Sequence, residues 1–184
     1  SFGEREVGRR RRRNGIQVWV NSFWFVSLLC TWFIFQHVIF LVGALSAIST
    51  ATSDTWATEI GLNSKWDKTY MIKGFRKVQP GTDGGISVSG TLGGLVGSLL
   101  IGLLAYIIFP QIDLVAGSLV ALMGFAGCQA DSYLGALFQY EARTLDLSWM
   151  GMKQFTLDNN GVNLAATGIG SLSSLILIYI LMLT

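Results

Sequence analysis

The sequence predicts an all-α fold, a polytopic bundle of about five transmembrane helices that forms one integral membrane domain over residues 1–184. Hydrophobic residues make up 51% of the chain and charged residues only 13%. The apolar residues also gather in runs that are long enough to cross a bilayer, which takes about 20 residues. We therefore expect spans at residues 16–35, 37–56, 86–109, 112–138 and 162–183.

The basic residues are segregated, and their positions predict the topology. Five consecutive arginines at residues 9–13 lie in a juxtamembrane segment, residues 1–15, and five further lysines and arginines follow the second span. The positive-inside rule places both groups on the cytosolic side or its equivalent. The first span then runs outward, and the loops at residues 57–85 and 140–161 both face inward.

The first span carries polar residues on one face. Arg13, Gln17 and Asn21 recur every four residues, so they lie on the same side of a helix where it enters from the inner interface. Snorkelling to the interface is the usual explanation for a single arginine. Three stacked polar groups also indicate contact with a lipid head group or a nucleotide, and both interpretations stay open.

The second and fourth spans each bring a carboxylate to the inner interface. Asp54 and Asp131 each lie about 17 residues into their spans, or ~26 Å at the rise of an α-helix. Carboxylates are costly near hydrocarbon, and Mg²⁺ is usually held by one or two carboxylates plus substrate phosphates. We therefore predict a metal site there, with helix capping as the alternative. Glu59 is a further candidate ligand, although a regular helix turns it about 140° from Asp54.

The loop between the second and third spans combines basic side chains with a glycine-rich turn. Lys73, Arg76 and Lys77 precede the sequence Pro-Gly-Thr-Asp-Gly-Gly. Its glycines can expose backbone amides toward an anion, and we expect the third helix to add its dipole and free amides at Ile86 and Ser87. The loop is not a Walker A sequence, but it has the properties of a phosphate-binding nest. The alternative is a basic loop held near anionic lipid.

The third span has a face of small residues, and the fifth begins after a polar motif. Small residues four apart allow close helix packing, so we interpret this face of the third span as scaffold. Its residues are Gly90, Gly93, Gly94, Gly97 and Ser98. Asp158, Asn159 and Asn160 immediately precede the fifth span. We therefore expect the four polar motifs that contain Asp54, Asp83, Asp131 and Asp158 to converge on one membrane face.

Several function classes have no support in the sequence. There is no Cys/His metal spacing, no Gly-x-Ser-x-Gly elbow and no dinucleotide fingerprint. Cys30 and Cys128 both fall inside apolar runs, where a thiol usually behaves as a small hydrophobe. A transporter is expected to place its polar groups near the midplane, whereas these gather at one interface. We expect no nucleic-acid partner.

Five motifs taken in order resemble the transmembrane protein 19 and phytyl-phosphate kinase family. They are Arg13-Asn-Gly-Ile-Gln-Val-Trp-Val-Asn21, Asp54-Thr-Trp-Ala-Thr-Glu-Ile-Gly61, Lys77-Val-Gln-Pro-Gly-Thr-Asp-Gly-Gly85, Asp131-Ser-Tyr-Leu-Gly-Ala136 and Asp158-Asn-Asn-Gly-Val-Asn163. The resemblance implies a kinase that uses CTP to convert an isoprenoid monophosphate, such as phytyl phosphate, into its diphosphate. It also implies further N-terminal spans, so we expect this chain, which begins at Ser1, to be a fragment that lacks them.

The resemblance and the residue patterns together define the expected partners. These are CTP, an isoprenoid phosphate lipid, membrane lipids and Mg²⁺. We expect the membrane face that carries the motifs to be cytosolic or stromal. Whether the protein forms a homo-oligomer stays open. A more distant likeness to CDP-diacylglycerol synthases makes a cytidylyltransferase the alternative enzyme. A transporter or another non-catalytic membrane protein is the alternative from a different class.

The same two sources define the expected site. The catalytic residues are Asp54, Asp83, Asp131 and Lys77, and the metal ligands are Asp54, Glu59 and Asp131. By the likeness, Asp83 joins the two interfacial aspartates in holding metal or orienting phosphate. The residues expected to bind nucleotide and phosphate are Arg13, Gln17, Asn21, Lys73, Arg76, Gly81, Thr82, Gly84, Gly85, Asn159 and Asn163.

Overall fold

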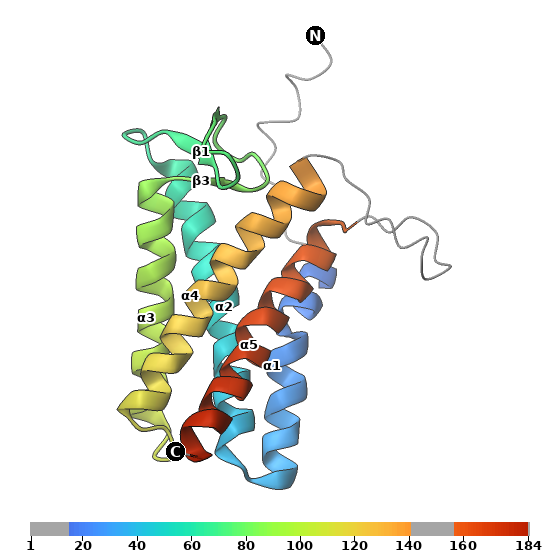
Figure 1. Cartoon of the computed structure of the whole chain (residues 1–184), viewed down its shortest axis with the longest axis vertical. Helices are drawn as coiled ribbons and strands as arrows, with labels where there is room; N and C mark the ends of the chain where they lie inside the picture. Colours follow the sequence, from blue (N-terminus) through green and yellow to red (C-terminus); the bar gives the residue numbers. More distant parts are fainter. Residues whose placement is uncertain (1–14, 141–156, 184) are drawn as a thin grey trace, which may run out of the picture.

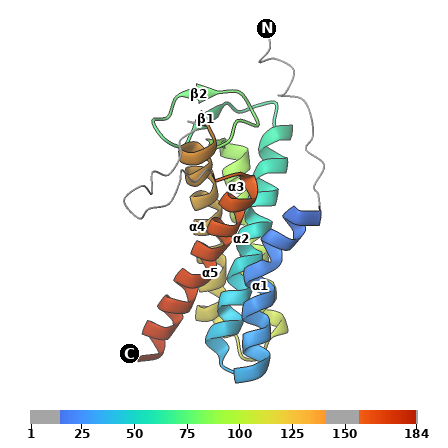
Figure 2. The same ribbon diagram turned by 90° about the vertical axis from the view of Figure 1, so that its right-hand side faces the viewer.

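A computed structural model describes residues 15–140 and 157–183 and arranges long helices side by side in one bundle (Figure 1; Figure 2). The helices are α1 Gly15–Phe35, α2 Val38–Asn63, α3 Val88–Ile108, α4 Leu114–Gly135 and α5 Asn159–Leu183. In the part of the chain that the structure describes, five helices are long and apolar enough to cross a membrane. The predicted bundle and its multi-pass membrane character are confirmed.

Helix α2 lies at the centre of the bundle and contacts each of the other four long helices. Its residues 41–47 are all buried, and it also buries a row of hydroxyl side chains: Ser46, Ser49, Thr50 and Ser53. Ser53 Oγ donates to the main-chain oxygen of Gly94 on α3 at 2.8 Å. Hydroxyl-to-backbone bonds between helices satisfy groups that lipid cannot.

Small residues bring the helices into close contact. A Cβ atom added to Gly102 of α3 would lie 2.5 Å from the main-chain oxygen of Gly117 of α4, so the two backbones touch at this crossing. The predicted packing face of α3 is buried, including Gly90, Gly94 and Ser98. Its interpretation as scaffold is therefore confirmed.

A small sheet covers one end of the bundle, and the sequence analysis did not anticipate it. Its strands are β1 Thr69–Met71, β2 Lys77–Val78 and β3 Gly85–Ile86, in the order β2-β1-β3 with both pairs antiparallel. The sheet lies where α2 and α4 end and α3 and α5 begin (Figure 1). The α1–α2 and α3–α4 turns lie at the opposite end (Figure 1).

Several helix boundaries differ from the prediction, including those of α2 and α5. Helix α2 continues to Asn63, so the first seven residues of the predicted loop 57–85 are helical. Helix α5 begins at Asn159, three residues before the predicted span. Residues 1–14 of the predicted basic segment and residues 141–156 of the predicted inner loop lie outside the described residues.

Candidate functional site

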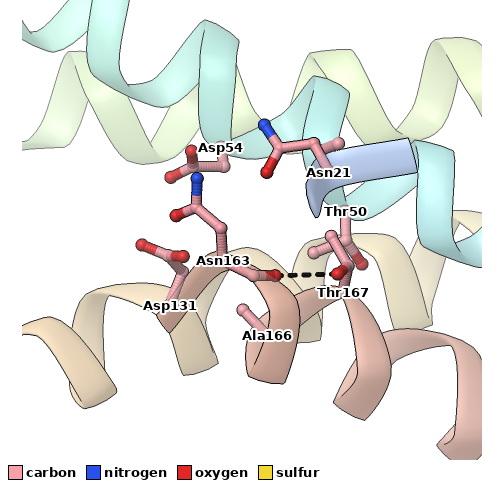
Figure 3. A pocket seen from close by; sticks show the side chains of 8 residues that line it. Asn21, Thr50, Asp54, Asp131, Asn163, Ala166 and Thr167 are labelled. Atoms are coloured by element: carbon pink, nitrogen blue, oxygen red, sulfur yellow. Dashed lines mark hydrogen bonds between the residues drawn. The ribbon is translucent and has the colours of Figure 1, made fainter. Parts of the chain in front are cut away.

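A small polar cavity with a volume of about 10 Å³ lies between four helices near the sheet-covered end of the bundle. Its lining combines two carboxylates, two amides and two hydroxyls with two alanines (Figure 3): Asn21 of α1, Thr50, Ala51 and Asp54 of α2, Asp131 of α4, and Asn163, Ala166 and Thr167 of α5. Four of the five predicted motifs therefore meet in one place.

The two predicted interfacial aspartates share this cavity. Asp54 comes from α2 and Asp131 from the adjacent α4, which runs in the same direction (Figure 1). The Asn163 side chain extends from α5 toward Asp54, with Asp131 beside it (Figure 3). The depth estimated from helix rise thus placed both carboxylates at one level.

The Asn163 amide connects the cavity residues. When its nitrogen is assigned to face the acceptors, that nitrogen lies 3.0 Å from Asp131 Oδ2 and 3.2 Å from the main-chain oxygen of Asn159. The other end of the amide lies 3.1 Å from the Asn21 side chain. A main-chain oxygen such as that of Asn159 can only accept, so the hydrogen-bond network determines this orientation. Asn163 therefore holds Asp131 in place, and the other end of its amide faces the Asn21 side chain of α1.

Two threonines line the inner part of the cavity. Thr167 Oγ1 donates to the main-chain oxygen of Asn163 at 2.7 Å (Figure 3), and Thr50 Oγ1 donates to the main-chain oxygen of Ser46 at 3.0 Å. Each hydroxyl proton is thereby directed into its own helix. The hydroxyl oxygens keep lone pairs that can accept a bond, so they add acceptors to the carboxylates.

The glycine-rich turn packs directly against the end of α4. Gly84 has a φ of +78°, and a Cβ atom there would lie 2.5 Å from the main-chain nitrogen and Cα of Ala136. The main-chain carbon of Asp83 lies 3.7 Å from the Cβ position of Gly135, four residues after Asp131 on α4. The three aspartates predicted as catalytic thus gather at one end of the bundle.

The predicted free amides at the start of the third helix are a point of correction. Ile86 pairs with Tyr70 in the sheet, and Ser87 is the N-cap of a helix that begins at Val88. The backbone N–H of Gly85 donates to the oxygen of Thr82 at 2.8 Å. Sequence spacing cannot distinguish a free amide from one that a turn or a strand already uses. The amides of Gly85 and Ile86 are therefore not available as predicted, and the amide of Ser87 stays a prediction.

Asp67, which the sequence analysis did not select, occupies the beginning of α3 instead. Its Oδ2 accepts from the backbone N–H of Ser89 at 2.6 Å, and its Oδ1 accepts from Ser89 Oγ at 3.0 Å. The hydroxyl of Ser64 and these Ser89 donors lower the pKa of Asp67 to about 2. A resident carboxylate thus interacts with the positive end of the helix, where a phosphate was expected.

The remaining predicted residues do not line the cavity. Glu59 is exposed, and the unbroken α2 helix turns it away from Asp54. Gln17 is half-buried on α1, Asn159 contributes its main-chain oxygen, and Arg13 lies outside the described residues. The basic residues belong to the sheet region at the same end of the bundle (Figure 1): Lys73, Arg76 and Lys77.

The donor set suits a hard divalent cation. Among the described residues, no group of three or more His, Cys, Asp or Glu side chains is arranged to hold a metal ion. The cavity instead offers two carboxylates, two amides and two hydroxyls, with no nitrogen or sulfur of the kind that Zn²⁺ prefers. Two carboxylates completed by phosphate and water oxygens are the usual arrangement for Mg²⁺.

Comparisons with known proteins place the chain among integral membrane proteins. The family model described as integral membrane protein DUF92 matches residues 3–171. The chain is 40% identical over 139 residues to an uncharacterized membrane protein of Methanocaldococcus jannaschii, covering 76% of this chain and 51% of the relative.

Two relatives come from Arabidopsis thaliana. Protein PGR is 29% identical over 160 residues, covering 75% of this chain and 55% of the relative. Protein VTE6, chloroplastic, is 30% identical over 144 residues, covering 76% of this chain and 38% of the relative. The chain thus spans about half the length of these curated relatives, or less. No solved structure matches the chain.

Proposed function

This chain belongs to the DUF92 family of integral membrane proteins, and from that premise we propose that it is a membrane-embedded phosphotransferase. The proposed reaction transfers the γ-phosphoryl group of CTP to an isoprenoid monophosphate with Mg²⁺. The motif resemblance to the phytyl-phosphate kinase family supports this choice of reaction. Because the chain covers about half of its relatives or less, the activity is proposed for the full-length protein.

One observation carries the proposal: Asp54 and Asp131 reach one cavity from separate helices. Two carboxylates that share a site repel each other, and both lie in helices long enough to span the membrane. A bound cation offsets both costs. The basic sheet lies at the same end of the bundle, where an anionic co-substrate arrives from the aqueous side (Figure 1).

Each residue near the cavity has a proposed role. Asp54 and Asp131 are the groups that would hold Mg²⁺, which when bound supplies charge neutralisation and orientation of phosphate oxygens. Asn163 fixes the direction of the Asp131 carboxylate. We assign Asp83 to orienting phosphate. Lys73, Arg76 and Lys77 supply positive charge to the triphosphate from the sheet region.

The transfer step demands little covalent chemistry from the protein. A phosphate oxygen of the lipid attacks the γ-phosphorus of CTP, a new P–O–P bond forms, the bond to the β-phosphate oxygen breaks, and CDP leaves. The nucleophile is already an anion, so no strong general base is needed. Positioning and electrostatic stabilisation carry most of such a reaction.

The test is a transfer assay with the full-length protein in lipid nanodiscs. CTP labelled at the γ-phosphate is offered with a panel of polyprenyl monophosphates, and lipid products are separated. Asp54→Asn and Asp131→Asn keep the side-chain size but remove the charge. We expect each to lower kcat by at least about 100-fold. Full activity in both variants would overturn the metal assignment.

Asp113→Asn is the matched control. Asp113 caps α4 at the opposite end of the bundle, where its carboxylate accepts from the N–H of Ala116 at 2.8 Å. Asparagine caps a helix about as well as aspartate, so this variant should keep its activity. The three variants remove the same charge, and only two remove it from the cavity.

The products separate this proposal from its alternatives. A kinase leaves the label on the lipid and releases CDP. A cytidylyltransferase transfers CMP and releases labelled pyrophosphate, an outcome that replaces the kinase. If no acceptor is turned over and CTP stays intact, the non-catalytic alternative is favoured.

A further inference from the structure

An apolar groove runs along α5 beside the polar cavity. It has a volume of about 520 Å³, and its lining is almost wholly apolar. One wall is Trp24 of α1, and the other residues come from α5 and the segment before it, including Leu164, Gly168, Leu172 and Ile176. The leucines and isoleucines that α5 contributes to it are exposed rather than covered by other helices of the described chain.

Small residues and one fixed indole give the groove its shape. A Cβ atom on Gly168 would lie 2.8 Å from Trp24 Nε1, so the ring rests directly on this glycine. Trp24 Nε1 also donates to the main-chain oxygen of Leu164 at 3.0 Å. The indole is therefore held in place, and Gly161 and Ala165 leave room in the lining.

The groove and the polar cavity are built from the same two helices. Asn21 of the cavity and Trp24 of the groove are one helical turn apart on α1. On α5, Asn163 lines the cavity while its neighbour Leu164 lines the groove. The polar cavity at the membrane face thus adjoins the apolar groove, which leads into the bilayer.

The length of the groove fits a hydrocarbon chain. The groove extends along α5 from Gly161 to Ile176, which is ~22 Å at the rise of an α-helix. One leaflet of the hydrocarbon core is about 15 Å thick, so the groove crosses the depth of a leaflet. A fitting occupant is apolar along its length and carries one anionic end that reaches the cavity.

We propose that this groove binds the hydrocarbon chain of the isoprenoid phosphate while the phosphate reaches Asp54 and Asp131. The inference rests on the proposed function and identifies where that substrate lies. Trp24 separates the apolar chain from the polar head. The groove also makes chain length a determinant of substrate choice.

The experiment fills the groove and compares acceptors of different chain length. Ala165→Phe places a ring inside the groove, whereas Ala126→Phe places the same ring on the exposed surface of α4. The full-length protein in nanodiscs is assayed with a long-chain and a five-carbon isoprenyl monophosphate. We expect Ala165→Phe to lower the ratio of kcat/KM for the long chain to that for the short chain by about tenfold. Ala126→Phe should leave this ratio at the wild-type value.

A binding readout keeps the two proposals separable. A long-chain isoprenyl phosphate with a diazirine in its chain is photolysed on the protein, and the labelled peptides are identified. Label on residues 157–176, reduced by Ala165→Phe, supports the groove even if no acceptor is phosphorylated. In that case the proposed reaction fails and the lipid site stands.

Two labelling results would overturn the groove. One is labelling confined to α3 or α4. The other is an unlabelled α5, which means that a second copy or another part of the full-length protein covers it. An unchanged chain-length ratio in Ala165→Phe, with transfer activity present, would also contradict the proposal and leave the proposed reaction intact.

Discussion

Gly84 and Gly74 offer a direct test of how tightly the glycine-rich turn is packed. Both have a left-handed backbone, with φ values of +78° and +80°. An added Cβ atom at Gly84 meets the backbone of Ala136 at 2.5 Å, whereas at Gly74 nothing lies within 4 Å. Replacing each glycine with alanine therefore imposes the same backbone strain, but only Gly84→Ala adds a clash with α4.

The expected magnitudes follow from these two contributions. An L-residue in the left-handed region costs roughly 1–2 kcal/mol, which is the whole effect expected for Gly74→Ala. Overpacking against a neighbour that cannot move adds roughly 1–3 kcal/mol, so Gly84→Ala should cost about 2–5 kcal/mol. Ala136 is the first residue of the π-helical turn that continues α4, so its backbone has little freedom to withdraw.

Thermal unfolding in one detergent measures the difference. Cys128 is only 1% exposed, and its reaction with a thiol-sensitive fluorophore reports unfolding once Cys30 is replaced by alanine. At roughly 2–4 °C per kcal/mol for a chain of this size, Gly84→Ala should melt about 2–12 °C below Gly74→Ala. Equal Tm values would refute the close packing of the turn on α4.

Two further predictions concern Asp67 and Asn163. The pKa of Asp67 is lowered from its ordinary value of 3.8 to about 2, so its stabilising contribution is complete above about pH 4 and is lost as the pH falls toward 2. Asp67→Ala should therefore melt below wild type at pH 7, and the difference in Tm should shrink between about pH 4 and 2. A difference that stays constant would contradict the role of the Asp67 carboxylate at the beginning of α3. Asn163→Ala removes the donor that orients Asp131, so the Mg²⁺ concentration for half-maximal transfer should rise about 10–100-fold. A Mg²⁺ titration measures this shift, and an unchanged midpoint would exclude the positioning role.

Helix geometry explains which parts of the fold could be predicted. A fixed rise per residue and a bilayer of known thickness placed Asp54 and Asp131 at one level, although they lie on different helices. The sheet was missed because strands of two or three residues carry no readable period. The end of α2 at Asn63 was missed because its last turns are polar enough to resemble a loop.

The site was only partly predictable, for a different reason. The sequence identifies which residues can bind phosphate or metal, but not which of their groups are already engaged. The carboxylate of Asp67 and the backbone N–H of Gly85 both have partners within the protein. Thr50 and Thr167 line the cavity through the packing of α2 against α5, and no motif distinguishes them from other buried threonines.

The central position of α2 bears on how the protein is made. This helix precedes α3, α4 and α5 in the chain, so they emerge from the ribosome only after it. Until they arrive, α2 meets lipid with Asp54 and a row of hydroxyls that the finished bundle encloses. Back-bonding within the helix, as from Thr50 to the oxygen of Ser46, lowers the cost of that exposure. We therefore expect α2 to stay beside α1 at the insertion machinery until the later helices are inserted.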